Sequence, residues 1–155
     1  MLIDKYLKNE LKIQNEITHP NLIKLLAWAE DEEFLYIITE YIDGGQLTEF
    51  LKTNSLRINE KITIIKNIAS GMLYLHSYSP PIIHRDLKSF NILLSKNKDR
   101  AYVIDYGKSK QLTTTYVNKT SEKDATLAWM DPEIFTNTKL LMKPYYIYRN
   151  THDRN

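Results

Sequence analysis

The sequence contains no cysteine. Disulfides and thiolate-ligated metal sites are therefore excluded. No apolar run approaches the length that a membrane span needs, and residues 1–12 carry charges throughout, without the apolar core of a signal peptide. From these absences we expect a soluble, cytoplasmic protein that does not bind membranes.

Neither sign of charge dominates. Lysine and arginine together number 21 and aspartate and glutamate 19, so the net charge is +2 and both signs are interspersed. This balance gives no indication of a nucleic acid partner. With 155 residues, of which 43% are hydrophobic, the chain can form one domain with a buried core.

Glycine is scarce. The chain has only four glycines, and the first of them is Gly44. A glycine-rich loop that cradles phosphates is therefore absent from the part of the chain ahead of Gly44.

Hydrophobic periodicity and turn residues divide the chain into short elements. The pattern predicts a helix over 4–20 ended by Pro20, strands at 22–29 and 34–41, short and long helices at 46–52 and 58–77, and a hairpin over 91–107. Beyond Gly107 the chain is polar and without periodicity up to Ser121, which is typical of a flexible loop. Residues 126–135 again have an ordered pattern, and the chain from Pro144 onward reads as a tail.

The helix over 58–77 has the clearest pattern. Apolar residues at three- and four-residue steps trace one face of it: Ile58, Ile62, Ile65, Ala69, Met72 and Leu73. This face needs a packing partner, and exposed apolar area of that kind predicts aggregation or a partner protein.

The stretch IIHRDLKSFNILL, residues 82–94, places polar side chains between two apolar runs. A polar loop between buried segments is a candidate site, because loops carry function on a rigid frame. The alternative is an ordinary charged turn. The polar residues are His84, Arg85, Asp86, Lys88 and Asn91.

Three motifs in the chain resemble those of protein kinases, and they occur in the family's order. HRDLKSFN resembles the catalytic loop H-R-D-L-x-x-x-N, and residues 105–107 (DYG) resemble D-F-G. Residues 131–133 (DPE) resemble A-P-E. The resemblance covers residues 10–135.

The resemblance implies an α+β fold, a partial form of the bilobal kinase domain over residues 1–135. Residues 1–45 would form a remnant N-lobe, with the αC helix, two strands and the hinge. Residues 46–135 would form the first half of a helical C-lobe with the catalytic loop and activation segment. Residues 136–155 are an unmatched tail.

The same resemblance implies roles for individual residues. Asp86 would accept or orient the proton of the substrate hydroxyl, Lys88 would hold the γ-phosphate, and Asn91 and Asp105 would bind Mg²⁺. Around ATP, Thr39 would set the depth of the pocket and the backbone of Glu40 and Ile42 would meet adenine. Leu93, Lys88 and Asp105 complete the implied ATP-binding residues.

Other positions match structural and regulatory residues of the family: Glu10 as the αC glutamate, His84 as a brace of the loop, Arg85 as a phosphate contact, and Tyr106, Gly107, Thr126 and Glu133 as anchors of the activation segment. Candidate phosphorylation sites there are Thr113, Thr114, Thr115, Tyr116, Thr120 and Ser121, although any one of them can equally be a solvent-facing residue.

Three features are most similar to the tyrosine-kinase-like group of Ser/Thr kinases: Lys88 and the stretches LKSFNILL and TLAWMDPEIF. The family's glycine-rich loop, strand lysine and lower C-lobe have no counterpart in the chain, so we expect weak ATP binding and an inactive polypeptide. Gln14 also stands where the family has an apolar residue, and burial of an unpaired amide costs about 1–3 kcal/mol. The partner would be a protein substrate or, in the alternative reading as a non-catalytic scaffold, a kinase. A third reading is a chain that does not fold alone.

Overall fold

The computed structural model describes residues 5–111. Its helices are α1 (Lys5–Glu16), α2 (Leu47–Thr53), α3 (Ile58–Ser77) and the 3-10 helix η1 (Ser89–Asn91). Its strands are β1 (Leu25–Glu30), β2 (Leu35–Thr39), β3 (Ile82–Ile83), β4 (Ile92–Leu94), β5 (Ala101–Val103) and β6 (Lys110–Gln111). The strands pair as three antiparallel two-stranded sheets, β1–β2, β3–β6 and β4–β5, so the α+β expectation is confirmed.

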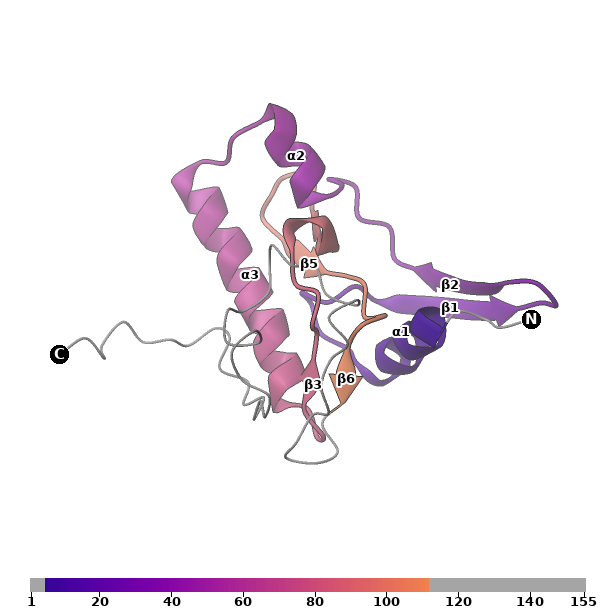
Figure 1. Ribbon diagram of the computed structural model, residues 1–155. Helices are drawn as coiled ribbons and strands as arrows, with labels where there is room; N and C mark the ends of the chain where they lie inside the picture. The colour runs from indigo at the N-terminus through magenta and orange to yellow at the C-terminus, as the bar shows by residue number, and fades with distance from the viewer. Residues whose placement is uncertain (1–4, 112–155) are drawn as a thin grey trace, which may run out of the picture.

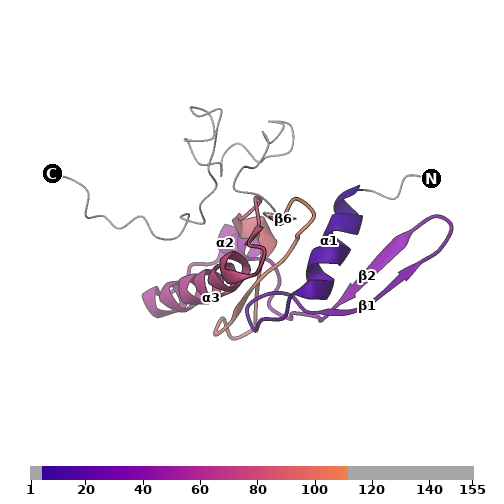
Figure 2. The same cartoon turned by 90° about the horizontal axis from the view of Figure 1, so that it is seen from below.

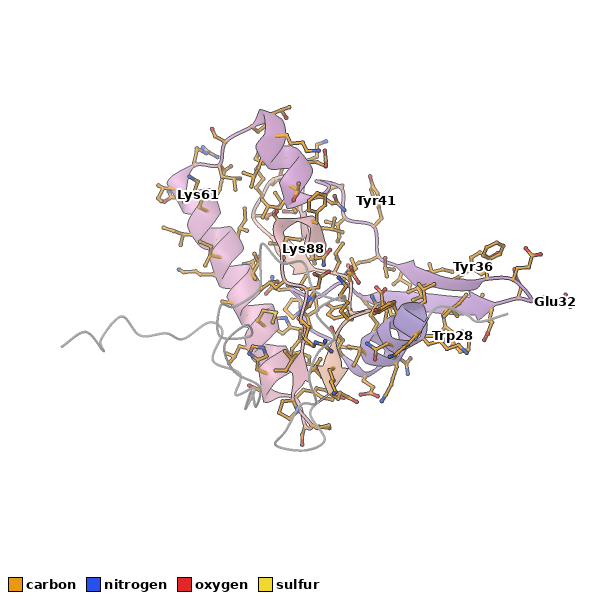
Figure 3. All side chains as sticks on the ribbon, in the orientation of Figure 1. Trp28, Glu32, Tyr36, Tyr41, Lys61 and Lys88 are labelled. Carbon is orange, nitrogen blue, oxygen red and sulfur yellow. The ribbon has the colours of Figure 1, made fainter. Side chains whose placement is uncertain are left out.

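The β1–β2 hairpin projects from the rest of the molecule with α1 beside it, whereas α3 runs along the opposite side (Figures 1 and 2). The hairpin carries large apolar side chains that are more than a third exposed: Leu26, Trp28, Phe34, Tyr36 and Ile38. Trp28 and Tyr36 point outward from it in Figure 3. Apolar area of this kind marks a surface that a further chain segment or partner can cover.

The predicted first strand begins too early. Leu22 and Ile23 are buried, but they lie beside β5: the Ile23 N–H donates to the Val103 carbonyl at 3.0 Å, and the Val103 N–H donates to the Asn21 carbonyl at 2.9 Å. The strand that pairs with β2 starts only at Leu25, opposite Thr39. An apolar run alone could not show which of two sheets each residue would join.

Helix α1 is shorter than the predicted range 4–20, because it ends at Glu16 before the turn at His19 and Pro20. Its buried residues are Ile13 and Gln14. The Gln14 Nε2 donates to Glu10 Oε1 at 2.9 Å, while its buried Oε1 has no hydrogen-bond partner among the described residues. The buried amide is therefore satisfied at its nitrogen but not at its oxygen.

The core lies between α3 and the β4–β5 hairpin, and both elements occur where the sequence pattern predicts a long helix and a hairpin. Leu75 on α3, Leu94 on β4 and Ala101 and Val103 on β5 are fully buried in it. Gly44 passes so close to β4 that an added Cβ would lie 2.3 Å from the Leu94 carbonyl oxygen, so no larger residue fits there. The tight packing fixes the end of β5, from which the candidate site extends.

Helix α3 has the predicted bounds but not the predicted core face. Its buried residues are Ile64, Gly71, Met72 and Leu75, while Ile58, Ile62, Ile65 and Leu73 are exposed. Only Met72 of the predicted stripe is buried, because the β4–β5 hairpin packs on the neighbouring side of the helix. Four residues of the stripe, Ile58, Ile62, Ile65 and Leu73, form exposed apolar surface. This agrees with the expectation that this face needs a further packing partner.

One further correction concerns the segment after Gly107. The predicted loop contains β6, which pairs with β3 through Ile82–Gln111 and Ile83–Lys110. The ordered pattern at 126–135 and the tail from Pro144 lie outside the described residues. None of the helices within 5–111 has the length and apolarity that crossing a membrane requires.

The two sides of α3 predict opposite responses to the same substitution. Leu75→Ala removes a fully buried side chain and is expected to lower the free energy of unfolding by about 2–5 kcal/mol. Leu73→Ala, on the exposed side, is the matched control and should change it by less than about 0.5 kcal/mol. Urea titration measures both, and equal losses would contradict the assigned core.

Candidate active site

Strands β3 and β6 bring the two candidate segments together. Residues 84–91 follow β3 directly, and residues 105–109 lead into β6, so the antiparallel pairing places them side by side. The Ser109 hydroxyl also donates to the His84 carbonyl at 3.2 Å. Figure 3 shows Lys88 near the middle of the molecule, between α3 and the β1–β2 hairpin.

Asp86 is held in place from several directions. It is 5% exposed, and the Asn91 Nδ2 donates both to its carbonyl at 2.9 Å and to its Oδ2 at 3.2 Å. Lys88 Nζ forms an ion pair with the same Oδ2 at 2.8 Å. A buried carboxylate with charged and neutral donors of this kind is fixed in orientation.

A second ammonium reaches the same carboxylate. Lys108 Nζ lies 3.4 Å from Asp86 Oδ2, and the Lys108 side chain is 28% exposed. Sequence reasoning missed this residue. The available signal was its position directly after Gly107, where a long charged side chain lies within reach of the adjacent loop.

His84 connects the loop to the end of β5. It is fully buried, its Nε2 lies 3.1 Å from the Ile104 carbonyl, and the Asp86 N–H donates to its Nδ1 at 3.3 Å. These contacts require a neutral ring with the proton on Nε2. Burial lowers the pKa of His84, which favours that neutral form.

Tyr106 packs edge-on against His84, with ring centroids 5.5 Å apart. It is fully buried, and its hydroxyl donates to the Val103 carbonyl at 2.8 Å. The phenol that replaces the family's phenylalanine therefore has a hydrogen-bond partner inside the core. Burial raises the pKa of Tyr106, so the hydroxyl keeps its proton.

A backbone hydrogen bond brings the segment of Asp105 next to Asn91. The Ile104 N–H, one residue before Asp105, donates to the Asn91 carbonyl at 3.0 Å. Because the Asn91 Nδ2 faces Asp86, the amide oxygen is the side-chain atom of Asn91 that could bind a cation. An amide oxygen and a carboxylate are suitable Mg²⁺ ligands, although no group of three acidic or histidine side chains within residues 5–111 converges as a complete metal cage.

Two residues of the site have left-handed backbones. The φ angle is 66° at Arg85 and 67° at Asp105. Residues other than glycine adopt this region rarely, and such conformations cluster at functional sites. Both segments are therefore held by their surroundings in conformations that the isolated chain would avoid.

Glu10 on α1 faces Asp105. Burial, and to a smaller extent the charge of Asp105, raise the pKa of Glu10 to about 7, while a hydrogen bond to the Tyr106 backbone opposes the rise. Within the described part of the chain, no salt bridge involves Glu10. Glu10 therefore lies within electrostatic reach of Asp105, and within residues 5–111 no lysine or arginine forms a salt bridge with it.

The candidate ATP-binding residues lie along the connection from β2 to α2 and on β4. Thr39 ends β2, and the Glu40 N–H donates to the Lys24 carbonyl at 3.0 Å. Ile42 and Leu93 are partly buried and pack against the same core cluster. The structure thus places Ile42 and Leu93 against one core. Thr126, Glu133 and the candidate phosphorylation sites lie outside the described residues.

The family model of the protein kinase domain matches residues 2–146 of the chain. The chain belongs to the protein kinase family. Among its relatives, a probable serine/threonine-protein kinase of Dictyostelium discoideum is 36% identical over 134 residues, which are 84% of this chain and 13% of the relative. Human serine/threonine-protein kinase TNNI3K is 38% identical over 130 residues, or 82% of this chain and 15% of the relative.

Wall-associated receptor kinase-like 10 of Arabidopsis thaliana is 36% identical over 141 residues, which are 87% of this chain and 18% of that protein. This kinase chain therefore spans less than a fifth of the length of these relatives. Their shared region includes the site described above, since the match of 2–146 contains both the loop over 84–91 and Asp105.

The buried position of Glu10 predicts that the free energy of unfolding depends on pH. A folded-state pKa near 7, above the reference value of 4.5, means that protonated Glu10 stabilises the fold below pH 4.5 and that this contribution is lost as the pH rises through 7. Glu10→Gln cannot lose a proton, so at pH 8 it should exceed the wild type in unfolding free energy by about 1–2 kcal/mol, after allowance for solvent screening.

Urea titrations from pH 4.5 to 8, in a chelator to remove divalent cations, measure this difference. Glu33→Gln, in the exposed turn between β1 and β2, controls for loss of one negative charge. A Glu10→Gln difference that is the same at both ends of the pH range would contradict the prediction.

Proposed function

We propose that this chain carries the phosphoryl-transfer segment of a protein serine/threonine kinase, which moves the γ-phosphate of ATP to a protein hydroxyl. The supporting observation is the convergence of Asp86, Asn91 and Asp105 on one place, with Lys88 paired to Asp86. Phosphoryl transfer depends on positioning and charge neutralisation, and these side chains can provide both.

Asp86 orients the substrate hydroxyl and accepts its proton. Its carboxylate is fixed by Asn91 and Lys88, so the oxygen that meets the hydroxyl does not have to be ordered during the reaction. Lys88, whose side chain is 17% exposed, can turn from Asp86 toward a phosphate oxygen. Arg85, on the same loop, would meet a phosphate on the activation segment.

Asn91 and Asp105 would hold Mg²⁺, and the ion would neutralise charge on the phosphates of ATP. The adenine would lie against Thr39, Glu40, Ile42 and Leu93, on the connection that leaves β2 and on β4. The fit rests on donor chemistry, because Asn91 supplies an amide oxygen and Asp105 a carboxylate, both of which suit Mg²⁺.

Lys88, two residues after Asp86, favours serine and threonine as acceptors, and the surrounding motifs favour the tyrosine-kinase-like group. We place the protein in the cytoplasm, with a protein substrate. Its N-lobe part would run over 1–45 and its C-lobe part over 46–135, and the family match extends the domain to residue 146.

A non-catalytic scaffold is the second candidate. It is favoured by Glu10, which faces Asp105 and has no ion-pair partner within residues 5–111. The isolated 155-residue polypeptide is therefore expected to bind ATP weakly, and its partner as a scaffold would be a kinase.

The decisive variant is Asp86→Asn, tested in the protein isolated from its own cells with an antibody against residues 48–79. Loss of the proton acceptor should reduce phosphorylation of a generic protein substrate by about 10²–10⁴-fold. Asp99→Asn, at an exposed carboxylate in the β4–β5 turn, is the matched control and should retain activity. Transfer that survives Asp86→Asn would contradict the assigned role, and no transfer by the wild type would favour the scaffold.

A further inference from the structure

Asn9, one residue before Glu10 on α1, reaches across to the segment that follows Asp105. Its Nδ2 lies 3.1 Å from the Tyr106 carbonyl, 3.0 Å from the Gly107 carbonyl and 2.8 Å from the Ser109 carbonyl. An amide group has two N–H donors, so one of them is shared between two carbonyls. Because carbonyls only accept, only a donor at this position can satisfy them.

The same segment touches α1 on both sides of Asn9. A Cβ at Gly107 would lie 3.2 Å from the Tyr6 Cβ, so the backbone approaches the first turn of α1 closely. At the other end of the helix, the Gln111 side-chain amide donates to the Glu16 carboxylate. Residues 107–111 therefore follow α1 along its length, as the approach of β6 to α1 in Figure 2 shows, and Asn9 makes the central contact.

This contact immediately follows the strained residue of the site. Asp105 has a φ angle of 67°, a conformation that persists only where neighbouring structure determines it. The turn that follows is closed by the Ser109 N–H, which donates to the Tyr106 carbonyl at 2.9 Å. Asn9 binds the carbonyls at both ends of this turn, so it fixes the path of the chain as it leaves Asp105.

The contact also extends to the catalytic loop. Ser109, whose carbonyl accepts from Asn9, donates its hydroxyl to the His84 carbonyl at 3.2 Å. The ring of His84 in turn accepts the Asp86 N–H. A continuous set of hydrogen bonds therefore leads from α1 through Asn9 and Ser109 to the residue two positions before Asp86.

We propose that Asn9 is a positioning residue that clamps the turn over 106–109 to α1 and thereby sets where Asp105 lies relative to Asn91 and Asp86. The meaning of that position rests on the proposed function, in which Asp105 and Asn91 hold Mg²⁺. The clamp itself is a property of the free protein.

Native-state hydrogen exchange on the full 155-residue chain tests the clamp. Asn9→Asp keeps the shape of the side chain but replaces its donors with acceptors, so amides over 106–111 should exchange about tenfold faster or more. Amides over 64–75 in α3 should be unchanged, because Asn9 does not contact that helix. Asn15→Asp makes the same chemical change at an exposed position of α1 and should alter neither region.

Unchanged exchange over 106–111 in Asn9→Asp would overturn the proposal. Equal acceleration over 106–111 and 64–75 would also overturn it, since it would show a general stabilising role. If Asn9→Asp does not fold into a stable protein, Asn9→Ala and its control Asn15→Ala replace the two aspartate variants, with the same expected results. Alanine removes the N–H donors without adding a charge.

A second readout tests the positioning. With ATP present, Mn²⁺ broadens NMR signals near its ligands, and Asn9→Ala should raise the Mn²⁺ concentration for half-maximal broadening at Asn91 several-fold. The same concentration in wild type and variant would overturn the link to Asp105. If the wild type shows no broadening at Asn91, the proposed metal site fails, whereas the exchange experiment still decides the clamp.

Discussion

The buried side chain of His84 joins the two segments on which the site depends. Its Nε2 binds the Ile104 carbonyl at the end of β5, its Nδ1 accepts the Asp86 N–H, and its ring packs against Tyr106. Because Nδ1 accepts a hydrogen bond, the ring is neutral, and burial favours this form. Together with the β3–β6 pairing and the Ile104–Asn91 hydrogen bond, this contact holds the loop of Asp86 beside the segment of Asp105.

The rest of the fold supports that connection. Helix α3 and the β4–β5 hairpin form the tightly packed core, and the site extends from the end of β5, where packing leaves little freedom. Two residues of the site, Arg85 and Asp105, have positive φ angles, and hydrogen bonds of the surrounding loops hold these segments. In contrast, the β1–β2 hairpin and one side of α3 present apolar surface and carry none of the side chains that contact Asp86, namely Lys88, Asn91 and Lys108.

The sequence predicts best what depends on local pattern. The 3.6-residue period and the prolines set the bounds of α3, the apolar–polar–apolar order predicts the β4–β5 hairpin, and the motif spacing identifies the loop around Asp86. What it misses depends on contacts between distant residues. Lys108 meets Asp86 only through the β3–β6 pairing, and Asn9 meets residues about a hundred positions away. The side of α3 that is buried likewise depended on where the hairpin packs, since Leu73 and Leu75 are equally apolar.

The central claim is that Asn91 and Asp105 form one cation site beside Asp86. Mn²⁺ added with millimolar ATP to the isotope-labelled 155-residue chain tests it directly by NMR, because paramagnetic broadening detects weak binding. The account predicts broadening centred on Asn91 and residues 105–107, and its loss in Asp105→Asn, which removes one carboxylate charge. Broadening centred elsewhere, or unchanged at Asn91 in Asp105→Asn, would contradict it.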